Sequence, residues 1–138
     1  MNPSAIIDAG PLVALLNARD RHHAWIVRAL QQLTGPLLTC EAVISEAIFL
    51  AGRYGDGSRQ IVRLLACGGV RIGFSMEQET DDVCRLLLKY ADVPMSLADA
   101  CLVRLSEKHP TLSIMTFDAH FLVYRRHQNQ TIPLIRPI

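Results

Sequence analysis

The sequence predicts an α/β fold, a three-layer α/β/α sandwich with a central parallel sheet of about four to five strands. Short apolar runs of strand type alternate along the chain with longer segments of helical pattern, which is typical of parallel strands joined by helices that cover both faces of a sheet. The length of 138 residues, half of them hydrophobic, suits one domain with a sizeable core. We therefore expect residues 1–138 to form a single domain, without repeats, low-complexity segments or linkers.

The first half of the chain opens with a strand that leads directly into a helix. Residues 5–7 are apolar, Asp8-Ala9-Gly10-Pro11 form a turn, and residues 12–16 continue as an apolar helical run. Asp20 is expected to cap a second helix, which Gly35-Pro36 ends. The other elements expected in this half are a strand at residues 37–39 and helices at residues 41–53 and 58–67.

The second half continues the alternation of strands and helices. Gly68-Gly69 leads into a strand at residues 70–74. The helix that follows reaches Tyr90 and has acidic residues in its first turns, where negative charge suits the helix dipole. A helix at residues 97–108 comes next, and His109-Pro110 ends it. The last elements expected are a strand at residues 112–116, a short helix at residues 118–125 and a candidate fifth strand at residues 132–135.

Composition excludes a disordered protein and bears on the kind of partner. The formal net charge is +1, with 14 basic and 13 acidic residues, and half of the chain is apolar, which excludes intrinsic disorder. The balance also gives no overall basic field of the kind that draws general nucleic-acid-binding proteins to phosphate. Twelve of the basic residues are arginine, whose planar fork binds phosphate bidentately. Bulk charge therefore argues against a polyanionic partner, whereas the arginine content is compatible with one.

Cysteine usage and the N-terminus indicate the compartment. The four cysteines include no C-x-x-C pair, which argues against a zinc site or a thioredoxin-like motif, and their apolar neighbours favour buried, reduced thiols. The N-terminus lacks the basic segment of a signal peptide, and the longest apolar run, near residues 11–16, is far too short to span a membrane. We expect a soluble, cytoplasmic protein.

Four carboxylates occupy positions where a ligand site is expected. Asp8 directly follows the first strand, and Asp118 lies two residues after Thr116, the last residue of the fourth strand. Ligands of parallel sheets bind beyond the carboxyl ends of the strands. Glu46 stands on an apolar helix face, and Asp99 precedes the apolar run of another helix. We expect these four carboxylates to meet at one end of the sheet.

Each of these carboxylates also has a simpler explanation when it is taken alone. Ser96-Leu97-Ala98-Asp99 has the form of a capping box, and on its own capping is the preferred interpretation of Asp99. An N-cap accounts for Asp118 and an Asx-turn for Asp8. A salt bridge to an arginine would satisfy Glu46. The combination of all four is what favours a common site.

Four converging carboxylates require a cation, because like charges a few ångströms apart raise each other's pKa. All-oxygen ligation favours Mg²⁺ or Mn²⁺ over zinc, and Mg²⁺ usually keeps several waters that a substrate phosphate can replace. Gathering four of the 13 acidic residues into one pocket also leaves an excess of basic residues on the rest of the surface.

The residues around these carboxylates resemble, in order and spacing, the four acidic motifs of PIN-domain nucleases, and most closely the VapC-like toxins of bacterial and archaeal type II toxin–antitoxin systems. The matching segments are residues 6–16, 43–47, 94–100 and 116–121, so the resemblance spans essentially the whole chain. It implies a metal-dependent endoribonuclease with Mg²⁺ (or Mn²⁺) as cofactor and RNA as substrate. It also implies a homodimer, and a small cognate antitoxin whose C-terminal segment fills the active-site groove. The acidic quartet that it implies, both catalytic and metal-binding, is Asp8, Glu46, Asp99 and Asp118.

We further expect these four carboxylates to have different roles. Asp8 and Asp99 are expected to bind the metal directly, with Glu46 and Asp118 acting through water or orienting the nucleophile. The expected reaction is hydrolysis of an RNA phosphodiester by metal-activated water, without a covalent enzyme intermediate. Thr116 is a candidate for a hydrogen bond within the cluster, although a strand-end threonine is the simpler interpretation.

Two positions depart from the pattern of the family. Ser96 stands where related sequences often carry an additional aspartate, and Gly10 where many carry a hydroxyl residue. Both changes bear on metal occupancy and water positioning, so the number of metals per site stays open.

Basic residues near two of the motifs are candidate RNA contacts. After the fourth motif these are Arg125, Arg126, His120 and His127, which either line an RNA groove or form a solvated helix end. Near the first motif, an exposed basic turn contains Arg19, Arg21, His22 and His23. Trp25 fits the core or a dimer interface better than a base-stacking surface.

Two other classes of protein share parts of this pattern. Phosphoryl-transfer domains of the receiver or haloacid dehalogenase type also carry aspartates at strand ends. Here, however, Asp8 is followed by Ala9-Gly10, which gives no D-x-D motif, and the only lysines, Lys89 and Lys108, are not at strand ends. The second alternative is a non-catalytic or non-toxin PIN-like domain that acts by binding RNA or protein. The complete quartet argues against a non-catalytic role.

Overall fold

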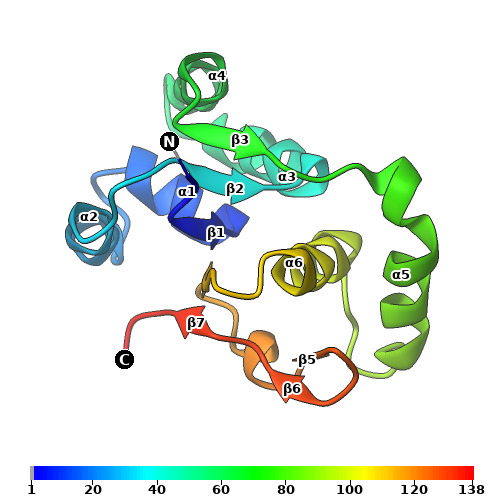
Figure 1. Ribbon diagram of the computed structural model, residues 1–138. Coiled ribbons are helices and arrows are strands. Elements are labelled where there is room, and N and C mark those ends of the chain that lie inside the picture. The colour runs from blue at the N-terminus through cyan, green and yellow to red at the C-terminus, as the bar shows by residue number, and fades with distance from the viewer. Residues whose placement is uncertain (1) are drawn as a thin grey trace.

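Figure 1 shows the computed structural model, which describes residues 2–138. Within these residues, five parallel strands form a sheet in the order β3-β2-β1-β4-β7. The strands are β1 (Ala5–Ile7), β2 (Leu37–Thr39), β3 (Val70–Ile72), β4 (Ile114–Met115) and β7 (Leu134–Ile135). The register places Ile6 opposite Leu38 on one side and Ile114 on the other. The predicted parallel sheet is therefore confirmed.

The helices connect these strands in two groups. They are α1 (Ala9–Leu16), α2 (His23–Gln31), α3 (Glu41–Ala51), α4 (Gly57–Cys67), α5 (Met76–Lys89) and α6 (Leu97–Lys108). Helices α1 to α4 serve the steps from β1 to β2 and from β2 to β3, whereas α5 and α6 lead back across the sheet to β4. The steps from β1 to β2 and from β2 to β3 run in one direction along the sheet, and the step from β3 to β4 runs in the opposite direction. Because crossovers between parallel strands are right-handed, this reversal of direction puts the second group of helices on the opposite face. This arrangement is the predicted three-layer α/β/α sandwich.

The reversal of direction creates a switch point between β1 and β4. The two strands are hydrogen-bonded neighbours, and the N–H of Asp8, just beyond β1, donates to the carbonyl of Met115 over 3.0 Å. The neighbouring strand β2 ends beside them, where the Thr39 hydroxyl donates to the Ile7 carbonyl over 2.8 Å. The carboxyl ends of three strands therefore meet at one edge, which is where parallel sheets bind ligands.

The core explains why short strands suffice for this fold. Every residue of β1, β2 and β4 is buried, as a sheet covered on both faces requires. Helix α6 is buried along most of its length, from Ala98 to Ser106, because it lies between the sheet and α5. No helix within residues 2–138 is long and apolar enough to cross a membrane.

The C-terminal segment differs from the prediction. The helix expected at residues 118–125 is only a 3-10 turn, η1 (Ala119–Leu122), and an antiparallel hairpin of β5 (Arg125–Arg126) and β6 (Gln130–Thr131) follows it. The hairpin turn holds His127 and Gln128 at positive φ, 48° and 75°. Neither is the Asn or Gly that usually marks such a turn, so the pattern was not visible.

The prediction that all cysteines are buried holds for only part of the set. Cys40 and Cys101 are buried, whereas Cys67 on α4 and Cys84 on α5 are exposed. Apolar sequence neighbours gave the wrong indication for the second pair, because each stands on the outward face of an amphipathic helix.

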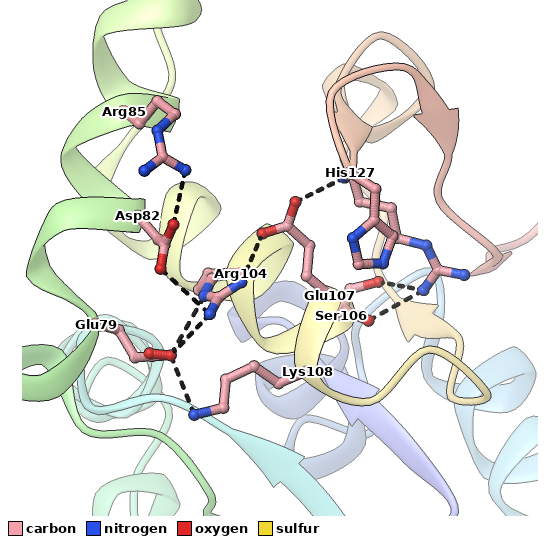
Figure 2. Close-up of polar contacts among 9 residues, drawn as sticks. Glu79, Asp82, Arg85, Arg104, Ser106, Glu107, Lys108 and His127 are labelled. Carbon is pink, nitrogen blue, oxygen red and sulfur yellow. Dashed lines mark hydrogen bonds and ion pairs between the residues drawn. The ribbon is translucent and has the colours of Figure 1, made fainter.

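A polar network joins α5, α6 and the hairpin (Figure 2). The guanidinium of Arg104 lies 3.2 Å from carboxylate oxygens of Glu79, Asp82 and Glu107, and Lys108 lies 3.0 Å from Glu79. From the hairpin, the N–H of His127 donates to Glu107 over 2.7 Å. The network holds α5 and the hairpin against the helix that carries Asp99.

Candidate active site

A pocket of about 770 Å³ opens beyond the carboxyl ends of β1 and β4. The residues of interest that line it are Asp8, Glu46, Asp99, Asp118, Phe117 and His120. The structure thus brings together the four carboxylates singled out from the sequence. They come from four separate segments: the ends of β1 and β4, the middle of α3 and the first turn of α6.

Asp8 is held in place by two hydrogen bonds from opposite directions. It is the N-cap of α1, where its Oδ1 accepts from the N–H of Ala9 over 2.8 Å. Its Oδ2 accepts from the hydroxyl of Thr116, also over 2.8 Å. Thr116 is fully buried and in turn accepts from the N–H of Asp118 over 3.0 Å. Thr116 therefore connects the first and fourth acidic segments, beyond what a plain strand-end threonine would do.

Asp99 occupies the first turn of α6, and capping accounts for only part of its bonding. The hydroxyl of Ser96, the N-cap, accepts from the N–H of Asp99 over 3.0 Å. The carboxylate has a different partner, because its Oδ2 accepts from the phenol of Tyr124 over 2.8 Å. The capping-box interpretation thus explains Ser96 and the backbone of Asp99 but leaves its side chain to the pocket.

Tyr124 is a residue of this site that the sequence did not reveal. Its side chain is fully buried, with the ring 5.2 Å from those of Tyr90 and Phe121. Burial, followed by the hydrogen bond to Asp99, raises the pKa of the phenol, so Tyr124 stays a hydrogen-bond donor at neutral pH. Nothing in its sequence context separates it from an ordinary core aromatic.

Glu46 and Asp118 are more accessible than the other two carboxylates. Glu46 is exposed, and Phe49, on the same helix face, is 68% exposed. The apolar face of α3 on which Glu46 stands is therefore only partly buried: Val43 lies in the core, whereas Glu46 itself lines the pocket. Asp118 is half-buried and caps η1, where its Oδ1 accepts from the N–H of His120 over 2.9 Å.

The electrostatics of the pocket favour a bound cation. Asp8 and Asp99 are each only 9% exposed. The pKa of Asp8 is raised to about 6, chiefly by burial and to a smaller extent by the charges of Asp99 and Glu46, although hydrogen bonds from Thr116 and Ala9 lower it. The ionised carboxylate of Asp8 is therefore poorly compensated, chiefly because burial removes its hydration and in smaller part because other carboxylates lie near it. A divalent cation would compensate this negative charge.

The donor set fits a hard cation that keeps part of its hydration. All four side chains offer oxygen, which suits Mg²⁺ or Mn²⁺. Within residues 2–138, no three or more His, Cys, Asp or Glu side chains already converge as a metal cage. Mg²⁺ commonly binds through one or two carboxylates, with water and substrate phosphate as further ligands.

The basic residues after the fourth motif do not act as one group. His120 lines the pocket, with its Nδ1 3.1 Å from Asp118. Arg125 is half-buried, and its Nη1 donates to the carbonyls of Leu122, Val123 and Tyr124 over 2.8 to 3.1 Å. His127 is exposed in the hairpin turn, outside the residues that line the pocket.

The expectation that Arg126 contacts RNA is wrong. It is 5% exposed, and its guanidinium donates to the carbonyl and hydroxyl of Ser106 and to the carbonyl of Pro110, over 2.9 to 3.1 Å. A guanidinium already bonded inside the protein is not available to RNA. Arg126 instead ties the hairpin to the end of α6, because alternation along the short strand β5 turns it inward.

A three-layer sandwich with carboxylates gathered at its switch point defines a domain of the PIN type. Comparison with protein families agrees: the PIN domain model matches residues 5–126. The chain belongs to the PIN domain family.

Individual relatives extend this finding. Ribonuclease VapC26 of Mycobacterium tuberculosis (strain ATCC 25618 / H37Rv) is 30% identical over 123 residues, which cover 87% of this chain and 91% of the relative. Among solved structures, M. tuberculosis VapC20, described as a sarcin-ricin loop cleaving toxin, has a TM-score of 0.76 at 19% identity, covering 84% of this chain and 91% of that one. A toxin–antitoxin complex from Klebsiella pneumoniae has a TM-score of 0.61 at 21% identity, covering 83% and 87%. The predicted PIN-like fold is confirmed.

Proposed function

We propose that this chain is an endoribonuclease that hydrolyses RNA phosphodiester bonds with Mg²⁺ or Mn²⁺ bound in the acidic pocket, and that it is the toxin of a type II toxin–antitoxin pair. The observation that carries the proposal is the pair of buried carboxylates, Asp8 and Asp99, which face one pocket at the switch point with a buried hydroxyl fixing each. Membership of the PIN family and the similarity to Ribonuclease VapC26 support the same activity.

The residues divide the work according to their burial. Asp8 and Asp99, held by Thr116 and Tyr124, would bind the cation. The cation, when bound, lowers the pKa of a water and offsets charge on the phosphate in the transition state. Glu46 and Asp118, which are more accessible, would orient the attacking water and accept its proton at a carboxylate oxygen.

Further parts of the proposal concern partners and setting. The similarity to the Klebsiella pneumoniae toxin–antitoxin complex supports a small cognate antitoxin as partner. We further propose that the chain forms a homodimer and acts in the cytoplasm. Residues 1–138 would act as one nuclease domain. Of the RNA contacts expected after the fourth motif, His120 is retained, because it lines the pocket.

RNA cleavage tests the nuclease activity. Purified protein is incubated with structured RNAs in Mg²⁺, Mn²⁺ or EDTA, beside the variants Asp99→Asn and Asp81→Asn. Asp81 is exposed on α5 and serves as a matched control for the loss of one carboxylate. We expect cuts in either metal for the wild type and Asp81→Asn, and none in EDTA or with Asp99→Asn. Cleavage that persists in EDTA and in Asp99→Asn would contradict the proposed mechanism.

Growth in bacteria tests the toxin assignment separately. Induced expression of the wild type is expected to arrest growth, and Asp99→Asn to leave growth normal. Co-expression of a small protein encoded directly beside this chain should restore growth. Normal growth on expression of an active nuclease would argue against a toxin and leave the nuclease activity intact.

A further inference from the structure

Phe117 stands between two residues of the acidic cluster yet takes no part in their hydrogen bonds. Thr116 binds Asp8 and the backbone of Asp118, whereas the Phe117 side chain lines the pocket and is only half-buried. By contrast, the nearby aromatic Phe121 is 1% exposed. Phe117 therefore presents part of a phenyl ring to the space beside the carboxylates.

A second aromatic ring lies against Phe117. The imidazole of His22, at the N-cap position of α2, has its centroid 4.4 Å from that of Phe117 at an interplanar angle of 35°. Trp25 contacts the same phenyl ring edge-on, with centroids 5.7 Å apart and an angle of 65°. Trp25 itself packs against the core, so it supports the phenyl ring from behind. The three rings form an aromatic surface that reaches the pocket through Phe117, the one of them that lines it.

Gly10 makes room for this arrangement. A Cβ at position 10 would lie 3.2 Å from Cδ2 of Phe117, closer than an ordinary van der Waals contact. The absence of a side chain thus lets the phenyl ring lie over the first turn of α1. A serine or threonine at position 10 would therefore require the ring of Phe117 to shift.

Positive charge borders the aromatic surface. The Nε of Arg21 donates to Nε2 of His22 over 3.1 Å, and the N–H of His22 donates to Asp20 over 2.8 Å. These contacts fix His22 next to Phe117. Arg21 is exposed, as is Arg19 two residues earlier. An exposed guanidinium therefore lies next to the aromatic pair, on the basic turn noted in the sequence.

We propose that Phe117 and His22 form a subsite for one nucleobase of the RNA next to the scissile bond, with Arg21 contacting an adjoining phosphate. Proteins hold single-stranded RNA in this way, by stacking bases on aromatic side chains and pairing phosphates with arginine. The inference rests on the proposed function, because the acidic pocket beside the subsite is where the phosphodiester would be held.

Binding without cleavage provides the first test. A fluorescently labelled single-stranded oligoribonucleotide that the wild type cuts is titrated with protein in EDTA, and anisotropy gives the Kd. Phe117→Leu keeps a bulky apolar side chain but removes stacking, so it should weaken binding by about tenfold. Phe117→Tyr keeps the ring and should stay within about twofold of the wild type.

A matched control separates the subsite from a general loss of aromatic surface. Phe49 is 68% exposed on α3 and does not line the pocket. Phe49→Leu is the same substitution and should leave the Kd unchanged. Thermal unfolding of each variant checks that the fold is intact. An equal loss of binding in Phe49→Leu and Phe117→Leu would contradict the location of the subsite.

An abasic scan provides the decisive test. Single abasic nucleotides are placed in turn along the cleaved oligoribonucleotide, and Kd and kcat/KM are measured for the wild type and Phe117→Leu. For the wild type, an abasic nucleotide at one position next to the cut should weaken binding and lower kcat/KM by about tenfold. For Phe117→Leu, the same abasic nucleotide should cause no further loss of binding or of kcat/KM, because both changes remove the same stacking contact. If the losses caused by the abasic nucleotide and by Phe117→Leu multiply at every position, the proposed subsite is contradicted.

Failure of the subsite and failure of the proposed function give different results. A wild type that cuts RNA while Phe117→Leu binds and cuts the same RNA equally well would refute the subsite alone. A wild type that neither binds nor cuts any RNA in Mg²⁺ or Mn²⁺ would refute the proposed function, and the subsite with it.

Discussion

At the residue scale, two buried hydroxyls account for the presence of two carboxylates inside the protein. Thr116 donates to Asp8 and Tyr124 donates to Asp99, each over 2.8 Å. A buried polar group left without such a partner costs about 1–3 kcal/mol, and a charged one costs more. The two hydroxyls therefore both stabilise the carboxylates and set the directions of the oxygens that would bind a cation.

The first prediction concerns Tyr124. Tyr124→Phe removes one hydroxyl from a buried ring, so the affinity for Mn²⁺ and the rate of RNA cleavage should each fall by about tenfold. Calorimetric titration with Mn²⁺ measures the affinity. Tyr90→Phe is the matched control, because Tyr90 is a neighbouring buried ring whose hydroxyl accepts from the N–H of Arg125. Wild-type Mn²⁺ affinity in Tyr124→Phe would show that the hydroxyl does not position Asp99.

The second prediction concerns Asp8 in the metal-free protein. The pKa of Asp8 is raised to about 6, so the ionised carboxylate destabilises the folded chain at pH 7. Asp8→Asn removes that charge and should raise the free energy of unfolding by about 1 kcal/mol in EDTA. Urea unfolding provides the measurement, with Asp81→Asn as control. A clear loss of stability in Asp8→Asn would mean that the buried, ionised carboxylate does not carry the free-energy cost inferred from its raised pKa.

At the element scale, the polar network of Figure 2 joins α5 to α6 in addition to the buried apolar residues Val83 and Leu86 of α5. The acidic residues at the start of α5 suggested only a favourable interaction with the helix dipole. The structure instead places Glu79 at 5% exposure between Arg104 and Lys108. Which helix packs on which decides such pairings, and residue patterns along one helix do not contain that information.

The third prediction follows from this network. The hydrogen bond from Lys108, together with the charge of Arg104, lowers the pKa of Glu79 from its ordinary value of 4.5. A lowered pKa contributes stability above pH 4.5 that is lost as the pH falls through the folded-state value. Glu79→Gln should therefore cost about 1–2 kcal/mol at pH 7 and progressively less below pH 4.5. Unfolding in urea across pH 3–7 measures this, with exposed Glu77→Gln as control.

A constant difference between Glu79→Gln and the wild type at every pH would contradict this electrostatic account. It would indicate that Glu79 contributes through packing of its side chain instead of through its charge.

The fourth prediction concerns the hairpin. Gln128 adopts a φ of 75°, a left-handed conformation that costs a non-glycine residue about 1 kcal/mol. Gln128→Gly should raise the free energy of unfolding by about 0.5–1 kcal/mol, because relief of this strain exceeds the added flexibility of the unfolded chain. Chemical denaturation measures the change. Asn129→Gly, beside it but without positive φ, should be neutral or destabilising. Destabilisation by Gln128→Gly would refute the strain.

At the scale of the whole molecule, the switch point between β1 and β4 makes the site. The strand order places the ends of β1 and β4 side by side, although Asp8 and Thr116 are 108 residues apart in the sequence. Helix α6 then crosses to the opposite face and brings Asp99 to the same edge. No local segment contains the site, which exists only once the parallel sheet has formed.

This dependence on the whole fold sets the limit of prediction from sequence. Asp8 and Asp118 could be located because each follows an apolar strand. Asp99 could be assigned only together with the other three carboxylates, because its capping box alone favours a structural role. Tyr124 and Phe117 could not, since their roles depend on which elements pack around them. Arg126 was misplaced for the same reason: its burial follows from a hairpin whose two left-handed turn positions are His127 and Gln128 instead of Asn or Gly.

The fifth prediction tests most directly the claim that these carboxylates form one metal-dependent catalytic unit. Single-turnover cleavage of one RNA is followed across a Mn²⁺ titration for the wild type, Asp8→Asn and Asp81→Asn. The rate should rise with Mn²⁺ and saturate for the wild type and Asp81→Asn, and should be lower by about 10³-fold or more for Asp8→Asn at every concentration. Cleavage by the wild type that is independent of Mn²⁺, or a rate for Asp8→Asn close to that of Asp81→Asn, would contradict the account.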